Sequence, residues 1–300
     1  MNLPIELMPA AGWCKTVEQV GMLAKVPVIE RIIMGSFTVA HRDGNTDGTN
    51  FIVLKDGTSF NALGLPNGGF AYLKLHLREM VQIARDAGKL SVVNVAGDTP
   101  EEYLLLAEFA HSCGADDVEY NFGCPNKFAE GGTQSEIASY SIDLMEKTVA
   151  LLGAELRSTA AWFKFSPYAN PEERVRVAAW IASIKSLAVV RLTLCNTYPN
   201  CVPRDEKGKL LITAKNTNGR AGMAGYGFRH IARANAEHFR ALLPEKMMNY
   251  AGGISSGAHL VAAYRMGCTG AQIGTAFFNG DNFRIFEEIA ADFLEICEAA

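Results

Sequence analysis

Short apolar runs alternate with longer segments of helical period along this entire chain, and that alternation decides its fold class. Runs rich in β-branched and apolar residues predict strands at 31–36, 91–95, 118–122, 162–166, 189–195, 248–251 and 271–274. We expect an eighth strand at 51–54 or 59–63. Strands that alternate with helices in this way are parallel and joined by right-handed crossovers.

Helices are predicted between these strands. The segment 70–87 carries apolar residues at helical spacing, Asp98 and Asn170 each begin a signal of cap, proline and acidic first turn, Ser256 opens another helix, and 283–299 closes the chain. Eight strand–helix units in about 250 residues are typical of a closed (β/α)8 barrel, the TIM barrel of the α/β class. No Gly-x-Gly-x-x-Gly follows the first strand, which disfavours a dinucleotide-binding sheet.

No linker or abrupt change of composition divides the chain, so we expect residues 1–300 to form a single domain. Two stretches are predicted as insertions: 40–58, rich in Gly, Asp, Asn and Thr, and 198–227, which follows the sixth strand. Segments that follow barrel strands lie at the C-terminal face, where barrel enzymes bind substrates. We therefore expect both insertions to be lids or walls of a site at that face.

Composition excludes several classes of function. The chain is 49% hydrophobic and 20% charged, and its 28 basic and 32 acidic residues are mixed along its length, so it is neither disordered nor suited to nucleic acid. No apolar run approaches the ~20 residues that span a bilayer, and the N-terminus lacks a signal-peptide pattern. The seven cysteines form no CxxC and the histidines no HExxH, which disfavours a metal site. We expect a cytoplasmic enzyme.

The segment 120–126 ends a predicted strand and carries polar groups where a barrel binds its ligand. Gly123 and Pro125 predict a sharp exit there, so that Asn121, Cys124 and Asn126 converge. A thiol among amides can act as a proton acceptor or as a nucleophile. The alternative is a buried cysteine in a tight turn, with the amides bonded to the loop.

Lys164 interrupts an otherwise apolar strand, where lysine is rare unless it is paired. The N1–C2=O edge of a flavin, which becomes anionic on reduction, would be a suitable partner. The alternative is a lysine at a strand edge that faces solvent.

Glycines follow the last two predicted strands. Gly252, Gly253, Gly274 and Thr275, with the glycine-rich run 219–225, predict a phosphate site, because glycine lets backbone N–H groups approach an anion. Tight packing of the barrel is the alternative. The run 61–69 places two amides before a helix and predicts recognition of an amide-containing ligand, or else an ordinary turn.

These four segments, in this order, resemble dihydroorotate dehydrogenases of class 1, and class 1A most closely. The resemblance extends from Met8-Pro9-Ala10-Ala11-Gly12 to Gly274-Thr275 and includes Asn61-x-x-Gly-Leu-Pro-Asn67 and Asn121-x-x-Cys-Pro-Asn126. It implies a barrel with one FMN, usually a homodimer, that oxidises dihydroorotate to orotate in pyrimidine biosynthesis. It also implies a small-molecule substrate, a soluble electron acceptor such as fumarate, and hydride transfer to flavin N5.

The resemblance also implies roles for particular residues. Cys124 matches the base that removes the C5 proton. The residues that match substrate-binding positions are Asn67, Asn121, Asn126, Asn196 and Thr197, the last where serine is usual. Those that match cofactor-binding positions are Ala10, Gly12, Ser36, Asn61, Lys164, Gly222, Gly252, Gly253, Gly274 and Thr275.

The chain departs from this pattern on the side that would bind the carboxylate. Gly35 stands where the family has a lysine that contacts both flavin and substrate carboxylate, and Ala11 replaces a usual serine. The departure favours a second hypothesis, an FMN oxidoreductase acting on another dihydropyrimidine or unsaturated compound, with a pocket that Gly35 enlarges. A third hypothesis is a phosphate-binding barrel without redox chemistry, in which Lys164 forms a Schiff base.

Overall fold

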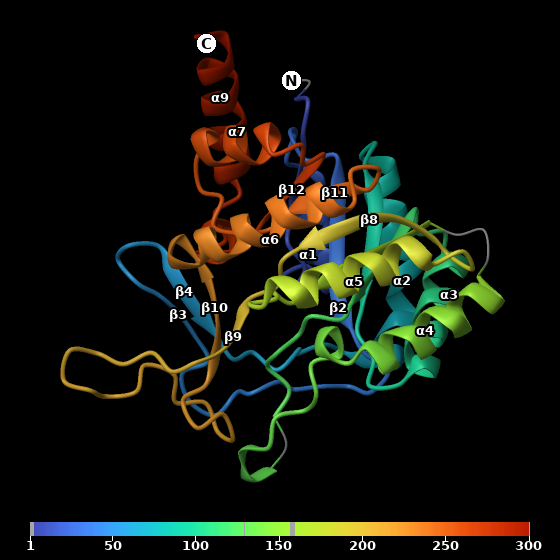
Figure 1. Cartoon of the computed structure of the whole chain (residues 1–300), viewed down its shortest axis with the longest axis horizontal. Helices are drawn as coiled ribbons and strands as arrows, with labels where there is room; N and C mark the ends of the chain where they lie inside the picture. Colours follow the sequence, from blue (N-terminus) through green and yellow to red (C-terminus); the bar gives the residue numbers. More distant parts are fainter. Residues whose placement is uncertain (1–2, 129, 157–159, 300) are drawn as a thin grey trace.

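Eight parallel strands form the centre of the protein in a computed structural model that describes residues 3–128, 130–156 and 160–299 (Figure 1). Their order around the sheet is β1-β12-β11-β8-β7-β6-β5-β2, and every pair of neighbours in this order is parallel. Their bounds are β1 Glu6–Pro9, β2 Arg31–Phe37, β5 Leu90–Val95, β6 Asp117–Asn121, β7 Ala160–Phe165, β8 Ala188–Leu194, β11 Met247–Tyr250 and β12 Gly270–Ile273. The predicted (β/α)8 barrel is confirmed.

The two outermost strands of this order, β1 and β2, meet and close the barrel. Leu7 forms a parallel bridge with Ile29, just before β2. Further along, the Gly12 amide donates to the Gly35 carbonyl at 2.6 Å, and the Gly35 amide donates to the Cys14 carbonyl at 2.7 Å.

Helices lie around the barrel, and two of them begin at predicted caps. The α-helices are α1 Val17–Ala24, α2 Gly69–Asp86, α3 Pro100–Ser112, α4 Ile142–Glu155, α5 Pro171–Ser183, α6 Arg229–Leu242, α7 Gly257–Arg265, α8 Thr275–Phe278 and α9 Arg284–Glu298, with short 3-10 turns η1 Glu130–Gly132, η2 Ala138–Tyr140 and η3 Tyr226–Phe228. Asn170 and Ser256 cap α5 and α7 as expected, whereas Thr99 and not Asp98 caps α3. Among the residues described, no helix has the length and apolarity needed to cross a bilayer.

The expected eighth barrel strand was misplaced. Both candidate segments, β3 Phe51–Val53 and β4 Thr58–Asn61, belong to a separate antiparallel sheet of order β3-β4-β10-β9, completed by β9 Tyr198–Cys201 and β10 Ala221–Gly225. The eighth barrel strand is β1, whose four residues are too few to show a hydrophobic period. It also carries Glu6, which Arg191 and Arg31 bind at 2.5 and 3.0 Å.

The two predicted insertions come together in this small sheet. Gly222 of the second insertion pairs with Asn61, which follows the first, and the Thr213 amide donates to the Thr49 carbonyl at 2.9 Å. In Figure 1 the small sheet lies beside the barrel, on the side away from the two chain ends. It is a wall beside the C-terminal ends of the barrel strands.

The barrel interior changes from apolar to polar along its axis. Met8, Ile33, Val92 and Trp162 form an enclosed apolar cluster. Two residues beyond Trp162 on β7, Lys164 enters a buried polar layer in which Glu119, from β6, is the central acceptor. Since side chains at i and i+2 of a strand share a face, this polar layer lies above the apolar cluster and forms the floor of the site.

Candidate active site

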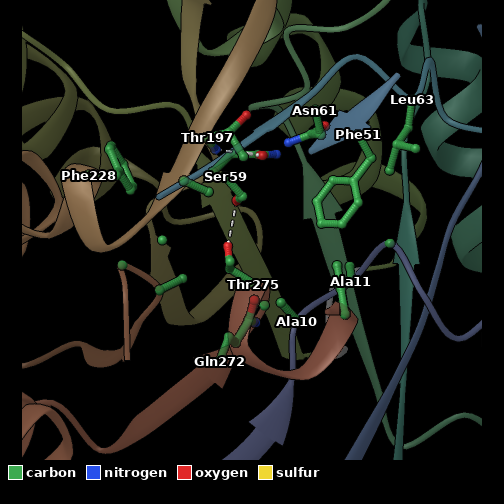
Figure 2. A pocket seen from close by; sticks show the side chains of 18 of the residues that line it. Ala10, Ala11, Phe51, Ser59, Asn61, Leu63, Thr197, Phe228, Gln272 and Thr275 are labelled. Carbon is green, nitrogen blue, oxygen red and sulfur yellow. Dashed lines mark hydrogen bonds between the residues drawn. The ribbon is translucent and has the colours of Figure 1, made fainter. Parts of the chain in front are cut away.

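A pocket opens between the C-terminal ends of the barrel strands and the small sheet. Figure 2 shows its two sides: Ala10, Ala11, Gln272 and Thr275 come from the barrel, whereas Phe51, Ser59 and Asn61 come from the small sheet. The predicted wall function of the 40–58 segment is therefore met by residues such as Phe51 and Val53.

Side-chain amides form one polar side of the pocket. The Asn196 Nδ2 donates to Asn121 Oδ1 at 3.1 Å, and the Asn121 Nδ2 donates to the Ser36 hydroxyl at 2.9 Å. The Asn126 Nδ2 donates to Asn61 Oδ1 at 2.7 Å. These bonds run between segments from four different parts of the chain, so the amides are held in fixed orientations before any ligand binds.

Thr197, next to this chain of amides, has a hydroxyl that is buried and unbonded to the rest of the described structure. Its backbone amide is held by Asn196 Oδ1 at 2.8 Å, and the residue lines the pocket. A buried hydroxyl without a partner is costly, and a ligand atom that bonded to it would remove that cost.

Cys124 lies beyond the end of β6 and is part-buried at the pocket wall. Burial raises the pKa of its thiol above the ordinary value, while the Asn126 backbone amide and the charges of Lys127, Arg42 and Lys15 act in the opposite direction. A thiol held this way is a weak acid and, once deprotonated, a strong base toward a ligand C–H.

Lys164 faces the pocket from β7 with only 4% of its surface exposed, so the alternative of a solvent-facing lysine is wrong. Its Nζ donates to Gln272 Oε1 at 2.8 Å and lies 3.9 Å from Glu119 Oε2. Burial lowers the pKa of this ammonium, and the charge of Glu119 opposes that shift. Glu119 in turn accepts hydrogen bonds from Asn94, Thr193 and Gln272.

The glycines after β11 and β12 line the far end of the pocket. Gly253 has φ +72°, and a Cβ there would lie 2.5 Å from the Gly225 carbonyl oxygen. The backbone segments at Gly253 and Gly225 can therefore approach each other only because Gly253 has no side chain. A Cβ on Gly274 would have the Ala10 Cβ as its nearest neighbour, at 3.7 Å, so glycine at this position leaves open space in the pocket. Bare backbone around open space is suited to binding an anion through N–H groups.

Most residues singled out from the sequence line this one pocket. They are Cys124, Asn121, Asn126, Asn196, Thr197, Ala10, Gly12, Ser36, Asn61, Lys164, Gly252, Gly253, Gly274 and Thr275. Asn67 and Gly222 are not among the lining residues. Asn67 instead holds the loop before α2, since its side chain bonds Thr38, Leu65 and the Gly69 amide. Gly222 gives room to Thr197, whose hydroxyl a Cβ would approach to 2.0 Å.

Gly35 does not line the pocket either, so it does not enlarge it. It has φ +114°, and a Cβ on it would lie 2.4 Å from the Asn94 carbonyl oxygen and 2.9 Å from the Phe37 nitrogen. Both obstacles are backbone atoms of the barrel. The structure therefore has no room for a lysine at position 35.

Sequence reasoning missed several lining residues, among them Lys15, Gln272 and Phe228. Gln272 lies within a predicted strand and is polar at a position that faces the barrel axis, a signal that could have found it. Lys15 lies three residues after Gly12 and shows no local pattern. Its Nζ donates to the Pro66 carbonyl at 2.6 Å, and burial lowers its pKa to about 8.

The fold and the pocket define the protein as a (β/α)8 barrel whose pocket lies at the C-terminal ends of the strands, where barrel enzymes have their active sites. The family model described as dihydroorotate dehydrogenase matches residues 1–296, and the chain belongs to that family. Membership confirms the predicted enzyme class, an oxidoreductase, and at the level of the family the predicted oxidation of dihydroorotate in pyrimidine biosynthesis.

Individual relatives agree with this assignment. The dihydroorotate dehydrogenase (fumarate) of Saccharomyces bayanus is 30% identical over 97% of this chain and 89% of its own length. The catalytic subunit of dihydroorotate dehydrogenase B (NAD(+)) from Anoxybacillus flavithermus is 27% identical over 93% of this chain and 83% of its own. A crystal structure of the Eimeria tenella enzyme in complex with ferulenol has a TM-score of 0.77 over 98% of this chain and 81% of its own, at 16% identity, and shows the shared fold.

Proposed function

We propose that this protein binds FMN in the pocket and oxidises dihydroorotate to orotate, with Cys124 as the base. The observation that carries the proposal is that Cys124 and Lys164, which follow or lie on the neighbouring strands β6 and β7, line one pocket with the glycines after β11 and β12. A proton acceptor, a buried cation and an anion cradle are what such a reaction needs from its protein.

The residues present are suited to FMN. Gly252, Gly253, Gly274 and Thr275 would hold the phosphate, because their backbone leaves space that side chains would fill. Lys164 would face the electron-rich N1–C2=O edge of the ring system, and Phe51 and Leu63 of the small-sheet side would cover apolar surface. FMN, when bound, supplies the acceptor for the hydride that leaves C6 of the substrate.

The protein's own contribution is to orient the substrate and to move its C5 proton. The linked amides of Asn121, Asn126 and Asn196 present donors and acceptors that match the ring amides of a dihydropyrimidine. The Cys124 thiolate would take the proton. The small sheet over the pocket would limit the access of water during the step.

Further parts of the proposal concern the protein as a whole. Residues 1–300 would form one domain, and the protein would act as a cytoplasmic homodimer. The word fumarate in the names of several relatives supports a soluble electron acceptor of that kind for this chain.

The test is direct. Purified protein should be yellow, and anaerobic dihydroorotate should bleach the flavin absorbance and yield one orotate per flavin. A flavin that stays oxidised with dihydroorotate but is reduced by another dihydropyrimidine would favour the second hypothesis, which the lack of a lysine at position 35 still motivates. Colourless protein that borohydride links to a carbonyl ligand at Lys164 would favour the third.

A further inference from the structure

Lys15 enters the pocket from the loop between β1 and α1. The backbone of this loop is fixed at its end, because Gln19 Oε1 accepts from the Lys15 amide at 2.7 Å and from the Thr16 amide at 3.1 Å. Thr16 in turn caps α1. The position of Lys15 is thus set by the helix that follows it, and its side chain is directed inward to the Pro66 carbonyl.

The ammonium of Lys15 has no counter-ion among the residues that the structure describes. In the described parts of the chain, no carboxylate lies within 4.0 Å of its Nζ, and its one hydrogen bond goes to the Pro66 carbonyl. By contrast, Lys127 pairs with Asp98, and Lys164 bonds Gln272 beside Glu119. An ammonium has three donors, so two of those on Lys15 are free to bond a ligand.

Lys15 also lies next to the place where the family's lysine is missing. The Gly35 amide donates to the carbonyl of Cys14, the residue immediately before Lys15. Position 35 admits no side chain, whereas the loop between β1 and α1 supplies a lysine whose side chain lines the pocket. The loop after β1 therefore gives the pocket a positive charge that β2 does not supply at position 35.

We propose that Lys15 binds the carboxylate of an anionic ring substrate and so determines that the enzyme accepts acids such as dihydroorotate. This inference rests on the proposed function and adds to it the residue that selects the substrate class. Lys15 and Cys124 line the same pocket, so a carboxylate bound by Lys15 would lie in the pocket whose wall carries the proposed base.

The experiment measures the affinity for orotate and the KM for dihydroorotate in FMN-loaded Lys15→Met. Orotate binding is followed by its perturbation of the flavin absorbance. Loss of a charge-assisted hydrogen bond should raise the Kd and the KM about tenfold to a hundredfold. Lys15→Arg, which keeps the charge, should retain most of the affinity. Lys15→Gln, which keeps a donor to Pro66 without the charge, should behave as Lys15→Met does.

Lys25→Met is the matched control, because Lys25 is exposed at the C-terminal cap of the same helix. It should leave the Kd unchanged, and the FMN content and Tm of all four variants should match those of the unsubstituted protein. Normal orotate affinity in FMN-loaded Lys15→Met overturns the inference. Failure of the proposed function has another signature: the unsubstituted protein itself then retains no FMN or binds no orotate.

Discussion

The hydroxyl groups of Ser59 and Thr275, 216 residues apart, share a hydrogen bond of 2.7 Å. Ser59 belongs to β4 of the small sheet, and Thr275 begins α8 directly after the last barrel strand (Figure 2). Both residues line the pocket. The bond therefore joins the small sheet to the barrel at the end where the phosphate of FMN would bind.

Removing this link should weaken FMN binding. In Thr275→Val the side chain keeps its shape but loses the hydroxyl. Ser59 then loses its hydrogen-bond partner, and the phosphate of FMN loses a polar group beside it. We expect FMN affinity to fall about tenfold, as for loss of a hydrogen bond to a charged group. Fluorescence of released flavin measures the Kd. Thr269→Val, at the opposite end of β12, is the control and should keep its FMN.

The rate of flavin reduction should rise with pH into the alkaline range. Cys124 can accept a proton only in its thiolate form, and burial raises the pKa of its thiol. Below that pKa the rate of reduction should therefore fall about tenfold per pH unit. Stopped-flow reduction at saturating dihydroorotate between about pH 6 and pH 10 measures the profile. Saturation is needed because burial lowers the pKa of Lys15 to about 8, and loss of its charge would weaken substrate binding in the same range.

Cys124→Ala tests the same role without titration. Its reduction rate should fall by about 10²- to 10⁴-fold, the usual contribution of a general base, while FMN stays bound. A flat pH profile, or normal reduction in Cys124→Ala, would contradict the assignment of the base.

The barrel was predictable because seven of its strands are local runs of apolar or β-branched residues, which alternate with segments of helical period. The eighth was not, because β1 is short and its Glu6 is stabilised by Arg191, a residue 185 positions away. The small sheet was missed for a related reason. It pairs Asn61 with Gly222, and no local pattern in one sequence discloses a partner so distant.

The candidate site was likewise predictable only where local sequence determines the position of a residue. Motif position placed Cys124, Lys164 and the glycines, because each follows or lies on a barrel strand whose end was predictable. It gave no signal for Lys15, whose inward direction depends on the cap of α1 and on the Pro66 carbonyl. It also suggested that Gly35 enlarges the pocket, whereas Gly35 does not line the pocket and packs against the backbone of Asn94.

Gly35 should therefore tolerate no side chain. Gly35→Ala forces a Cβ into φ +114° and to 2.4 Å from the Asn94 oxygen, which should lower the free energy of unfolding by at least about 2 kcal/mol. Gly35→Lys should be no better and should not improve dihydroorotate turnover. Urea denaturation measures both variants.

Gly21→Ala is the matched control for this test. Gly21 lies within α1 and a Cβ on it would meet nothing within 4 Å, so alanine should stabilise the protein by about 0.5–1 kcal/mol. If Gly35→Ala were as stable as the unsubstituted protein, the barrel backbone near Asn94 would have moved to accommodate the Cβ, and the prediction would be wrong.

Lys164 and Glu119 provide a test that separates stability from cofactor binding. Lys164→Met leaves the Glu119 carboxylate buried without the cation 3.9 Å away, which should cost about 3–5 kcal/mol of unfolding free energy. It should also weaken FMN binding and lower the flavin potential, because a positive charge that favours the anionic reduced ring is lost.

The double variant Lys164→Met, Glu119→Gln removes the buried charge as well as its partner. It should regain more than about 1 kcal/mol of stability relative to Lys164→Met, since contacting residues are not additive. Its FMN affinity and flavin potential should stay low, because the Glu119→Gln substitution restores no cation at the pocket floor. Lys147→Met breaks an exposed ion pair with Asp143. It should change neither the free energy of unfolding nor the free energy of FMN binding by more than about 0.5 kcal/mol. If the double variant recovered both stability and FMN binding, Lys164 would serve only to neutralise Glu119 and would have no role toward the flavin.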